Sequence, residues 1–337
     1  RFFCCRKFTE LVMRLLVAEP ECYSVSNLEA LKDYGLLLHF TPHGVEQTEF
    51  DEIYSSITPE IVLLKLGISF GEKHLAVNPN LKIVVTPTTG LTHLESMIFD
   101  RVNVISLKGD TEFLNSVTST AEHAWFLLLS AVRNNTQKFI SKPTDSWSRT
   151  HYQDISQLSG KSLGIIGFGR LGKMIAKYGH GFNMSVMHND IKCDNVDPEY
   201  EFSQFVSLED LFEDSDYIIL SANYDDCQII NQKLLNNLSN PVDVFVNIAR
   251  GELLDETAMI DALRAKKIKS YYTDVLDGDA VWSTDEYKLN KLYIESQNGL
   301  DIKITPHIGG YAKEAIELAR SRVIYKLMEE LKNEINC

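Results

Sequence analysis

The feature that most constrains the fold is a glycine-rich turn between an apolar strand and a helix. The predicted strand 162–166 leads directly into Gly167-Phe168-Gly169-Arg170-Leu171-Gly172, and a helical segment, 173–178, and a second strand, 184–187, follow. Three glycines at this spacing allow a tight turn, close approach of backbone N–H groups to a pyrophosphate, and close packing of the helix on the strand. This complete context favours a dinucleotide site over a turn that only packs a helix against a strand.

An acidic residue after the second strand indicates which dinucleotide is bound. Asp190 lies 18 residues beyond Gly172 and can accept two hydrogen bonds from ribose hydroxyls. The next two residues, Ile191 and Lys192, offer no arginine to hold a 2′-phosphate. We therefore expect NAD rather than NADP.

Short apolar runs alternate with helix-like segments along most of the chain, whose 337 residues suffice for about two domains. Such alternation predicts βαβ units, and hence an α/β fold with two lobes built on parallel sheets. A polar stretch, 138–158, is expected to connect the lobes. The elements predicted before this connector are strands at 15–18, 36–40, 61–66 and 81–85 and helices at 26–34 and 118–134. The last helix is so apolar that we expect it to be buried between domains or subunits.

Composition excludes several classes of partner. The chain has 33 basic and 47 acidic side chains, a net charge of −14, and therefore repels nucleic acid and anionic membrane surfaces. Its apolar runs fall short of the roughly 20 residues that span a membrane. Six cysteines lack CxxC spacing, which favours a reducing compartment. We expect a soluble, cytoplasmic protein, with residues 1–12 as an N-terminal tail that lacks the apolar core of a signal peptide.

Three polar side chains follow predicted strands in the second half of the chain. Arg250 comes after the strand 244–248, where a guanidinium can bind a carboxylate through two hydrogen bonds. His307 comes after a strand and a proline, and histidine transfers protons readily near neutral pH. A carboxylate from the segment 273–279 beside that histidine would orient it and stabilise its charged form.

Each of these side chains also has a simpler structural interpretation. Arg250 can be a surface arginine before a glycine turn. The tripeptide Thr305-Pro306-His307 recurs at Thr41-Pro42-His43 with no obvious role. The alternative that His307 is a structural histidine therefore stays open. The acidic segment 273–279 can be a solvated loop; it lacks the remaining ligands of a calcium loop, so we expect no metal.

Taken in order, five motifs resemble the D-isomer-specific 2-hydroxyacid dehydrogenase family, in particular its short phosphoglycerate-dehydrogenase-like members. These motifs are VTSTAEH (117–123), GFGRLG with Asp190, NIARGELLDE (247–256), TDVLDGD (273–279) and ITPHIGG (304–310). The resemblance implies two Rossmann-like lobes, with the cofactor domain inserted into the substrate domain. The NAD-binding domain would span 117–308 and the substrate domain 13–116 with 309–337, and hinges are expected near Val117 and Gly309.

The resemblance also assigns roles to residues. Arg250 and His307 match the catalytic arginine and histidine, and Asp279 matches the carboxylate that holds the histidine. That carboxylate is normally a glutamate, so the pair must close by about 1 to 1.5 Å or its hydrogen bond lengthens toward about 3.6 Å. The implied cofactor-binding residues are Gly167, Phe168, Gly169, Arg170, Leu171, Gly172, Asp190, Ser221, Ala249 and Asp274, the last at the nicotinamide carboxamide.

Substrate binding is expected to involve the first domain. Backbone N–H groups of Thr89 and Gly90 can bind a carboxylate whatever their side chains are. The basic pair that binds phosphate in phosphoglycerate dehydrogenases is represented only by Lys65, with Gly67 at the second position. A phosphorylated substrate therefore stays open.

The resulting hypothesis is an NAD-dependent oxidoreductase that interconverts a D-2-hydroxy acid and its 2-oxo acid. The acid would be of the phosphoglycerate, glycerate or hydroxypyruvate, glyoxylate or lactate type. The alternative is a catalytically weak NAD(H)-binding regulator or corepressor on the same fold. We also expect a homodimer, because the helix 118–134 is apolar on more than one face and because dimers are the family habit.

Overall fold

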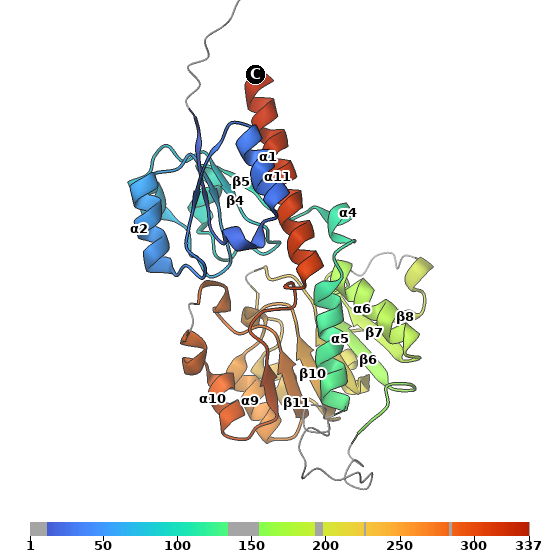
Figure 1. The fold of residues 1–337 in the computed structure, drawn as a ribbon. Coiled ribbons are helices and arrows are strands. Elements are labelled where there is room, and N and C mark those ends of the chain that lie inside the picture. The colour runs from blue at the N-terminus through green and yellow to red at the C-terminus, as the bar shows by residue number, and fades with distance from the viewer. Residues whose placement is uncertain (1–11, 134–154, 193–197, 226, 283–284, 337) are drawn as a thin grey trace, which may run out of the picture. The chain divides into compact units, whose positions relative to one another are not determined.

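The structure, a computed structural model, describes residues 12–133, 155–192, 198–225, 227–282 and 285–336. The chain forms two compact units (Figure 1). Unit 1 comprises Arg1–Leu114, Ala280–Ser283 and Lys313–Cys337, and unit 2 comprises Asn115–Asp279 and Thr284–Ala312. Unit 2 is thus an insertion into the sequence of unit 1.

Unit 1 contains a five-stranded parallel sheet in the order β2-β1-β3-β4-β5. Its strands are β1 (Arg14–Val17), β2 (Leu37–Phe40), β3 (Ile61–Leu63), β4 (Ile83–Val85) and β5 (Asn103–Ile105). Its helices are α1 (Val25–Asp33), α2 (Gln47–Ile57), α3 (Glu72–Val77), α4 (Thr111–Leu114) and α11 (Lys313–Asn336). Successive strand residues point to opposite faces, so Leu15 packs in a core with α1 and α11, and Leu16 in a second core with α2.

Unit 2 contains a seven-stranded parallel sheet in the order β12-β11-β10-β9-β6-β7-β8. Its strands are β6 (Ser162–Ile166), β7 (Ser185–Asn189), β8 (Ser203–Phe205), β9 (Tyr217–Leu220), β10 (Val242–Asn247), β11 (Ile268–Thr273) and β12 (Ile302–Ile304). Its helices are α5 (Ser119–Val132), α6 (Arg170–Gly181), α7 (Leu208–Asp214), α8 (Gln232–Asn236), α9 (Glu256–Arg264) and α10 (Lys291–Gln297). The two parallel sheets confirm the predicted α/β class.

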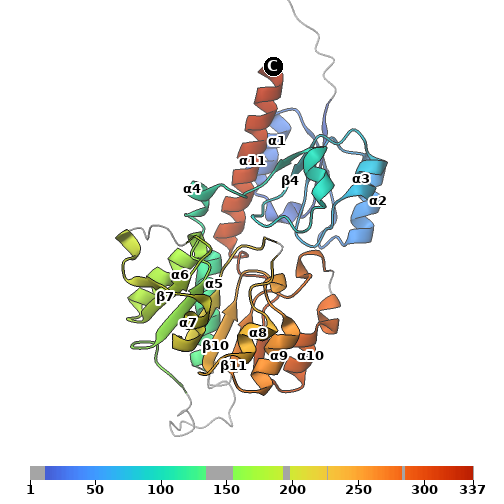
Figure 2. The ribbon, with the colours of Figure 1, turned by 180° about the vertical axis from the view of Figure 1, so that it is seen from behind.

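The strand order of unit 2 reverses next to β6, which positions a ligand site. The chain passes from β6 to β7 and β8 on one side, and returns to place β9 on the other side of β6. Ligands of open α/β sheets bind at such a reversal, beyond the carboxyl ends of the strands. In Figures 1 and 2, α5 and α6 cover one face of this sheet, and α8 and α9 cover the other.

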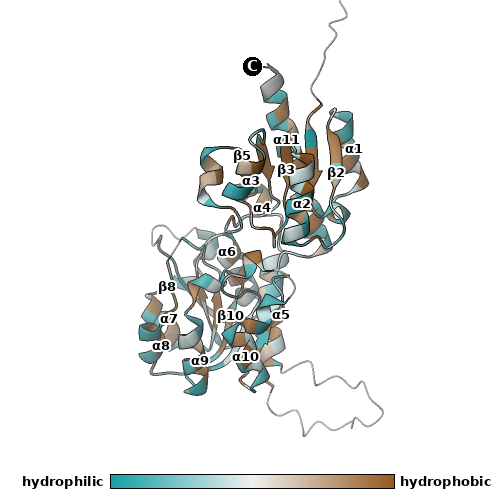
Figure 3. Ribbon diagram, turned by 90° about the vertical axis from the view of Figure 1, so that its left-hand side faces the viewer, coloured by the Kyte–Doolittle hydropathy of each residue, from teal (hydrophilic) through white to brown (hydrophobic). Residues whose placement is uncertain are grey.

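Helix α5 differs from its prediction in where it is buried. Its side chains Trp125 and Leu128 are 5% and 0% exposed and lie in the core of unit 2, against α6 and the sheet. The expectation that this helix is buried between domains or subunits is therefore wrong for its apolar face, because its own unit covers that face. Phe126 is 54% exposed. In Figure 3 the strands of both sheets are mostly hydrophobic, whereas the helices carry both hydrophilic and hydrophobic residues.

Within the described residues, no helix combines the length and the apolar character needed to cross a membrane.

Candidate active site

The turn after β10 holds Arg250 in a fixed backbone setting. Asn247, the last residue of β10, is fully buried; its Oδ1 accepts a hydrogen bond from the N–H of Ala249 at 2.9 Å. Its Nδ2 donates to the carbonyl oxygen of Arg250 at 3.1 Å. The guanidinium of Arg250 donates to the carbonyl oxygen of Ala249 at 2.7 Å.

The same turn lies directly against the segment that leads to Asp279. A Cβ at Gly251 would lie 2.0 Å from the carbonyl carbon of Leu276, which no side chain tolerates. Glycine at this position therefore lets the Arg250 turn, after β10, contact the turn after β11. The parallel strands bring both turns to the carboxyl edge of the sheet.

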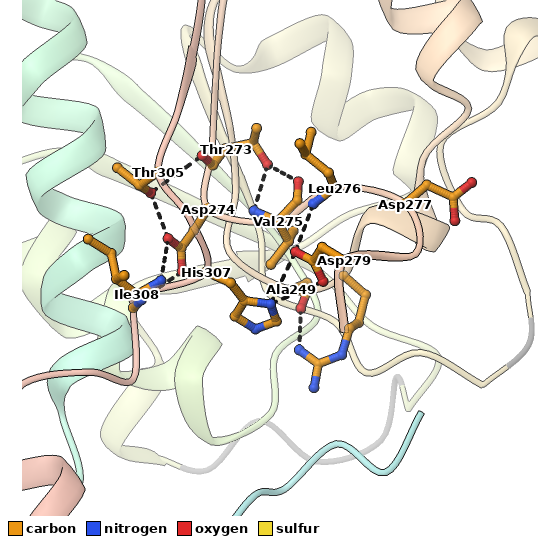
Figure 4. A network of polar contacts seen from close by, with 12 residues as sticks. Ala249, Thr273, Asp274, Val275, Leu276, Asp277, Asp279, Thr305, His307 and Ile308 are labelled. Carbon is orange, nitrogen blue, oxygen red and sulfur yellow. Dashed lines mark hydrogen bonds and ion pairs between the residues drawn. The ribbon is translucent and has the colours of Figure 1, made fainter. Parts of the chain in front are cut away.

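His307 and Asp279 form a hydrogen-bonded pair at this edge (Figure 4). Nδ1 of His307 lies 3.1 Å from each carboxylate oxygen of Asp279. The N–H of Leu276 donates to Oδ2 of Asp279 at 3.0 Å and fixes the carboxylate. Since an ionised carboxylate only accepts, Nδ1 carries the hydrogen, and Nε2 is left to exchange a proton. The shorter acid thus reaches its histidine.

The backbone at His307 is unusual. His307 has a φ of 54°, in the left-handed region that few residues other than glycine adopt. Its N–H donates to the carbonyl oxygens of Asp274 and Thr305, both at 2.9 Å. These bonds hold the loop against β11, so the position of the imidazole depends on the residues on either side of it.

The three glycines after β6 have separate functions. Gly167 has a φ of 89°, and a Cβ there would lie 2.4 Å from Cα of Ala222. A Cβ at Gly172 would lie 2.1 Å from the carbonyl oxygen of Gly167. At Gly169, the N-cap of α6, nothing lies within 4 Å of the added atom. Two glycines therefore close the turn, and the third leaves open space at the helix N-terminus.

Two other predicted cofactor residues, Asp190 and Ser221, contact this turn. Asp190 accepts from the N–H groups of Phe168 at 2.6 Å and Lys192 at 2.9 Å, one on each oxygen, and each oxygen can accept a further hydrogen bond. Ser221 donates from Oγ to the carbonyl oxygen of Gly167 at 2.8 Å.

The side chain of Arg170 serves a different part of unit 2. Its guanidinium donates to the carbonyl oxygen of Val117 at 2.9 Å, and burial lowers the pKa of Arg170. The neighbouring Leu171 packs against the core. These two side chains therefore help to fix α6 in place, and the backbone N–H groups of the first helical turn are suited to phosphate binding.

Comparison with known proteins agrees with this geometry. Residues 125–309 match the sequence model of the family described as D-isomer specific 2-hydroxyacid dehydrogenase, NAD binding domain. The chain belongs to this family. NAD is accordingly the cofactor of this 2-hydroxyacid dehydrogenase.

Two relatives of the dehydrogenase are each 27% identical to it. The hydroxypyruvate reductase of Thermotoga maritima aligns over 87% of this chain and 91% of its own length. The glyoxylate reductase of Pyrococcus furiosus aligns over 76% of this chain and 75% of its own length. The dehydrogenase is therefore an NAD-dependent oxidoreductase of D-2-hydroxy acids, and an enzyme is favoured over a regulator.

A solved structure shows the same fold. D-lactate dehydrogenase from Aquifex aeolicus, complexed with NAD and lactic acid, has a TM-score of 0.72 and 21% identity. The similarity covers 96% of both chains.

The described residues fit NAD. The open space at Gly169 leaves room for a pyrophosphate at the helix N-terminus, and Asp190, directly after β7, has acceptor capacity left for ribose hydroxyls. Among the residues that the structure describes, no group of three His, Cys, Asp or Glu side chains is placed to hold a metal ion.

The predicted substrate residues lie in unit 1. Thr88 donates from Oγ1 to the carbonyl oxygen of Gly90 at 2.8 Å, which fixes the loop. Within the described part of the chain, nothing accepts a hydrogen bond from the N–H of Thr89 or of Gly90. Lys65 follows β3 and forms no ion pair with any described residue. The N–H of Gly67 donates to the carbonyl oxygen of Ala280 at 3.1 Å.

Sequence reasoning did not single out three residues of this site. Asn247 was visible two positions before Ala249, but only the structure shows that its amide holds the Arg250 turn. Thr305 and His123 lie inside two of the recognised motifs, and neither was given a role. Thr305 is part of the loop that carries His307, and His123 contacts this loop through Thr305.

Proposed function

We propose that this dehydrogenase interconverts a short, unphosphorylated 2-oxo acid of the glyoxylate or hydroxypyruvate type and the corresponding 2-hydroxy acid. The pair of His307 and Asp279, beside the turn that carries Arg250, is the observation that carries the proposal. The activities of the two reductases support the substrate class. A single lysine, Lys65, with Gly67 in place of a second basic residue, argues against a phosphate group.

In this proposal three side chains of unit 2, those of Arg250, His307 and Asp279, act together at C2 of the acid. Arg250 binds the carboxylate of the acid and polarises the oxygen on C2. During reduction, His307 donates the proton from Nε2 to this oxygen as the C=O bond becomes single, and during oxidation it takes the proton back. Asp279 stabilises the imidazolium. When bound, NAD would supply the acceptor for the hydride that leaves C2 in oxidation, and NADH would supply the hydride for reduction.

We propose that the division of the sequence follows these functions. Residues 117–308 hold NAD, and 13–116 with 309–337 contribute to binding the acid. Within 13–116, the N–H groups of Thr89 and Gly90 would bind the carboxylate, which is supported by their lack of acceptors among the described residues.

The test is a substrate panel. NADH oxidation is followed by absorbance with glyoxylate, hydroxypyruvate, pyruvate and 3-phosphohydroxypyruvate, and NADH binding is measured separately by fluorescence. We expect the highest kcat/KM with glyoxylate or hydroxypyruvate. A preference for the phosphorylated acid would contradict the substrate class. NADH binding without oxidation by any acid would favour the regulator instead.

We further propose a cytoplasmic homodimer. Free Cys22 and Cys227 suit a reducing compartment, and the exposed Phe126 offers apolar surface to a second copy. Light scattering at micromolar concentration should give twice the mass of the chain. A monomeric mass would exclude the dimer.

A further inference from the structure

The carboxylate of Asp274 is occupied by the loop that carries His307. The side chain is 3% exposed. Its Oδ1 accepts from Oγ1 of Thr305 at 2.6 Å and from the N–H of Ile308 at 2.9 Å. Its Oδ2 accepts from the N–H of Gly309 at 2.7 Å. One carboxylate therefore binds the chain both before and after the histidine (Figure 4).

A second histidine completes this network from α5. Nε2 of His123 lies 2.9 Å from Oγ1 of Thr305 and 3.2 Å from Oδ1 of Asp274. The hydroxyl hydrogen of Thr305 is already donated to Asp274, so the hydroxyl can only accept from His123. Nε2 of His123 must therefore carry a hydrogen, and both nearby oxygens are acceptors for it.

This network keeps Asp274 ionised despite its burial. Burial by itself raises the pKa of Asp274, but the hydrogen bonds from His123, Thr305, Gly309 and Ile308 outweigh it, and the pKa lies below its ordinary value. A carboxylate that stays charged accepts stronger hydrogen bonds from the loop amides than a protonated one does.

We propose that His123 is a positioning residue that acts on His307 through Thr305 and Asp274. The proposal rests on the role of His307 in the proposed function. His307 has a disfavoured φ of 54°, and such a backbone persists only where its surroundings restrain it. With His123 removed, the loop relaxes and Nδ1 of His307 loses its alignment with Asp279.

The contribution of His123 can be separated from that of α5 as a helix. Trp125 and Leu128 anchor α5 in the core of unit 2, whereas the imidazole of His123 is directed to the loop. Replacing His123 therefore leaves the helix in place. Glutamine carries an amide donor at nearly the reach of imidazole Nε2, and leucine carries none.

The first experiment compares His123→Leu with His123→Gln. Since a displacement of about 1 Å can cost up to roughly a hundredfold in rate, we expect His123→Leu to lower kcat by about 10- to 100-fold. The Kd for NADH and the KM for the acid should stay close to those of the wild type, and His123→Gln should recover most of the lost kcat. His43→Leu, at an exposed histidine of unit 1 outside this network, is the control and should have no effect.

The second experiment does not depend on activity. Hydrogen exchange of the protein without ligand should become faster in the segment 304–310 of His123→Leu, and should return toward the wild-type rate in His123→Gln. Should His123→Leu fail to fold, Thr305→Val and Thr305→Ser provide the same comparison, because only serine keeps the hydroxyl. Unchanged exchange and unchanged kcat in the leucine variant would overturn the proposal, as would an equal loss in the leucine and glutamine variants. Altered exchange in a protein that reduces no acid would instead refute the proposed function alone.

Discussion

Aspartate at position 279 is compatible with catalysis because the local backbone brings it close to its histidine. Asp279 begins a 3-10 turn, Asp279–Val281, and the N–H of Leu276 holds one of its oxygens. The left-handed backbone at His307 directs Nδ1 to that carboxylate. With these contacts the shorter acid lies within hydrogen-bonding distance of Nδ1 of His307.

Replacing His307 with glutamine should remove the proton transfer and leave the cofactor site intact. We expect kcat to fall by roughly 10²- to 10⁴-fold, since glutamine cannot carry the proton. The NADH Kd, measured by fluorescence, should stay near its wild-type value because His307 lies outside the glycine turn. His43→Gln is the control. Near-normal turnover of His307→Gln would remove this residue from the mechanism.

Replacing Asp279 with asparagine should lower kcat, because His307 loses its charged partner. The amide keeps the size of the side chain, but it loses the charge that stabilises the imidazolium and can donate to Nδ1, which favours the wrong tautomer. We expect kcat to fall by roughly a hundredfold or more with little change in thermal stability. Steady-state kinetics and thermal unfolding test this, and an unchanged kcat would show that Asp279 only holds the turn.

Among the structural elements, the turn at the N-terminus of α6 restricts most clearly which residues it can contain. Gly167 and Gly172 are fixed by contacts inside the protein, whereas Gly169 faces open space. Gly169 is therefore needed by the ligand rather than by the fold, if the pyrophosphate lies at this turn.

Replacing Gly169 with alanine should weaken NADH binding without lowering the stability of the fold. The added methyl group occupies space in front of the helix N-terminus, so we expect NADH to bind roughly tenfold more weakly, or by about 1.4 kcal/mol. Thermal stability should change little. Gly181→Ala, at the other end of α6 with nothing within 4 Å, is the matched control for both measurements. Unchanged NADH affinity of Gly169→Ala would place the pyrophosphate elsewhere.

In the molecule as a whole, each unit buries a histidine that resists protonation. Burial lowers the pKa of His74 in unit 1 below 6.5, although hydrogen bonding to Asp51 opposes the shift. Burial likewise lowers the pKa of His188 in unit 2. Its ring stacks on that of Phe168, with the ring centroids 3.7 Å apart. Both histidines therefore stay neutral in the folded protein at pH values where the unfolded chain binds protons.

The stability of the whole chain should consequently decrease as the pH falls below about 6.5. The unfolded state takes up these two protons first, so the free energy of unfolding drops until the lower, folded-state pKa values are reached. Below about pH 4, carboxylates with lowered pKa values, such as those of Asp216 and Asp274, add to the loss. Urea unfolding from pH 8 to 5 measures the first effect. His188→Asn should reduce the pH dependence, and an unchanged slope would exclude a contribution from His188.

The agreement between prediction and structure was best where the signal was local. The strand before the glycine turn has its predicted bounds, 162–166, and the strand predicted at 184–187 is Ser185–Asn189. Strand β5, Asn103–Ile105, was not predicted, because Asn103 interrupts its apolar run, whereas β3 and β4 are apolar throughout. Helix α11 was not predicted either; Val323 and Leu327, one turn apart, are buried in the core of unit 1.

The amino-acid order alone sufficed to locate the dinucleotide turn and the three polar residues after the strands, because steric limits on glycine and strand periodicity act over a few neighbouring residues. The network that holds His307 required the folded chain. His123 and Thr305 are separated by 182 positions, and Asp279 and His307 by 28. Such contacts depend on which strands become neighbours and on the backbone angles of their loops, which are set by the packing of the entire unit.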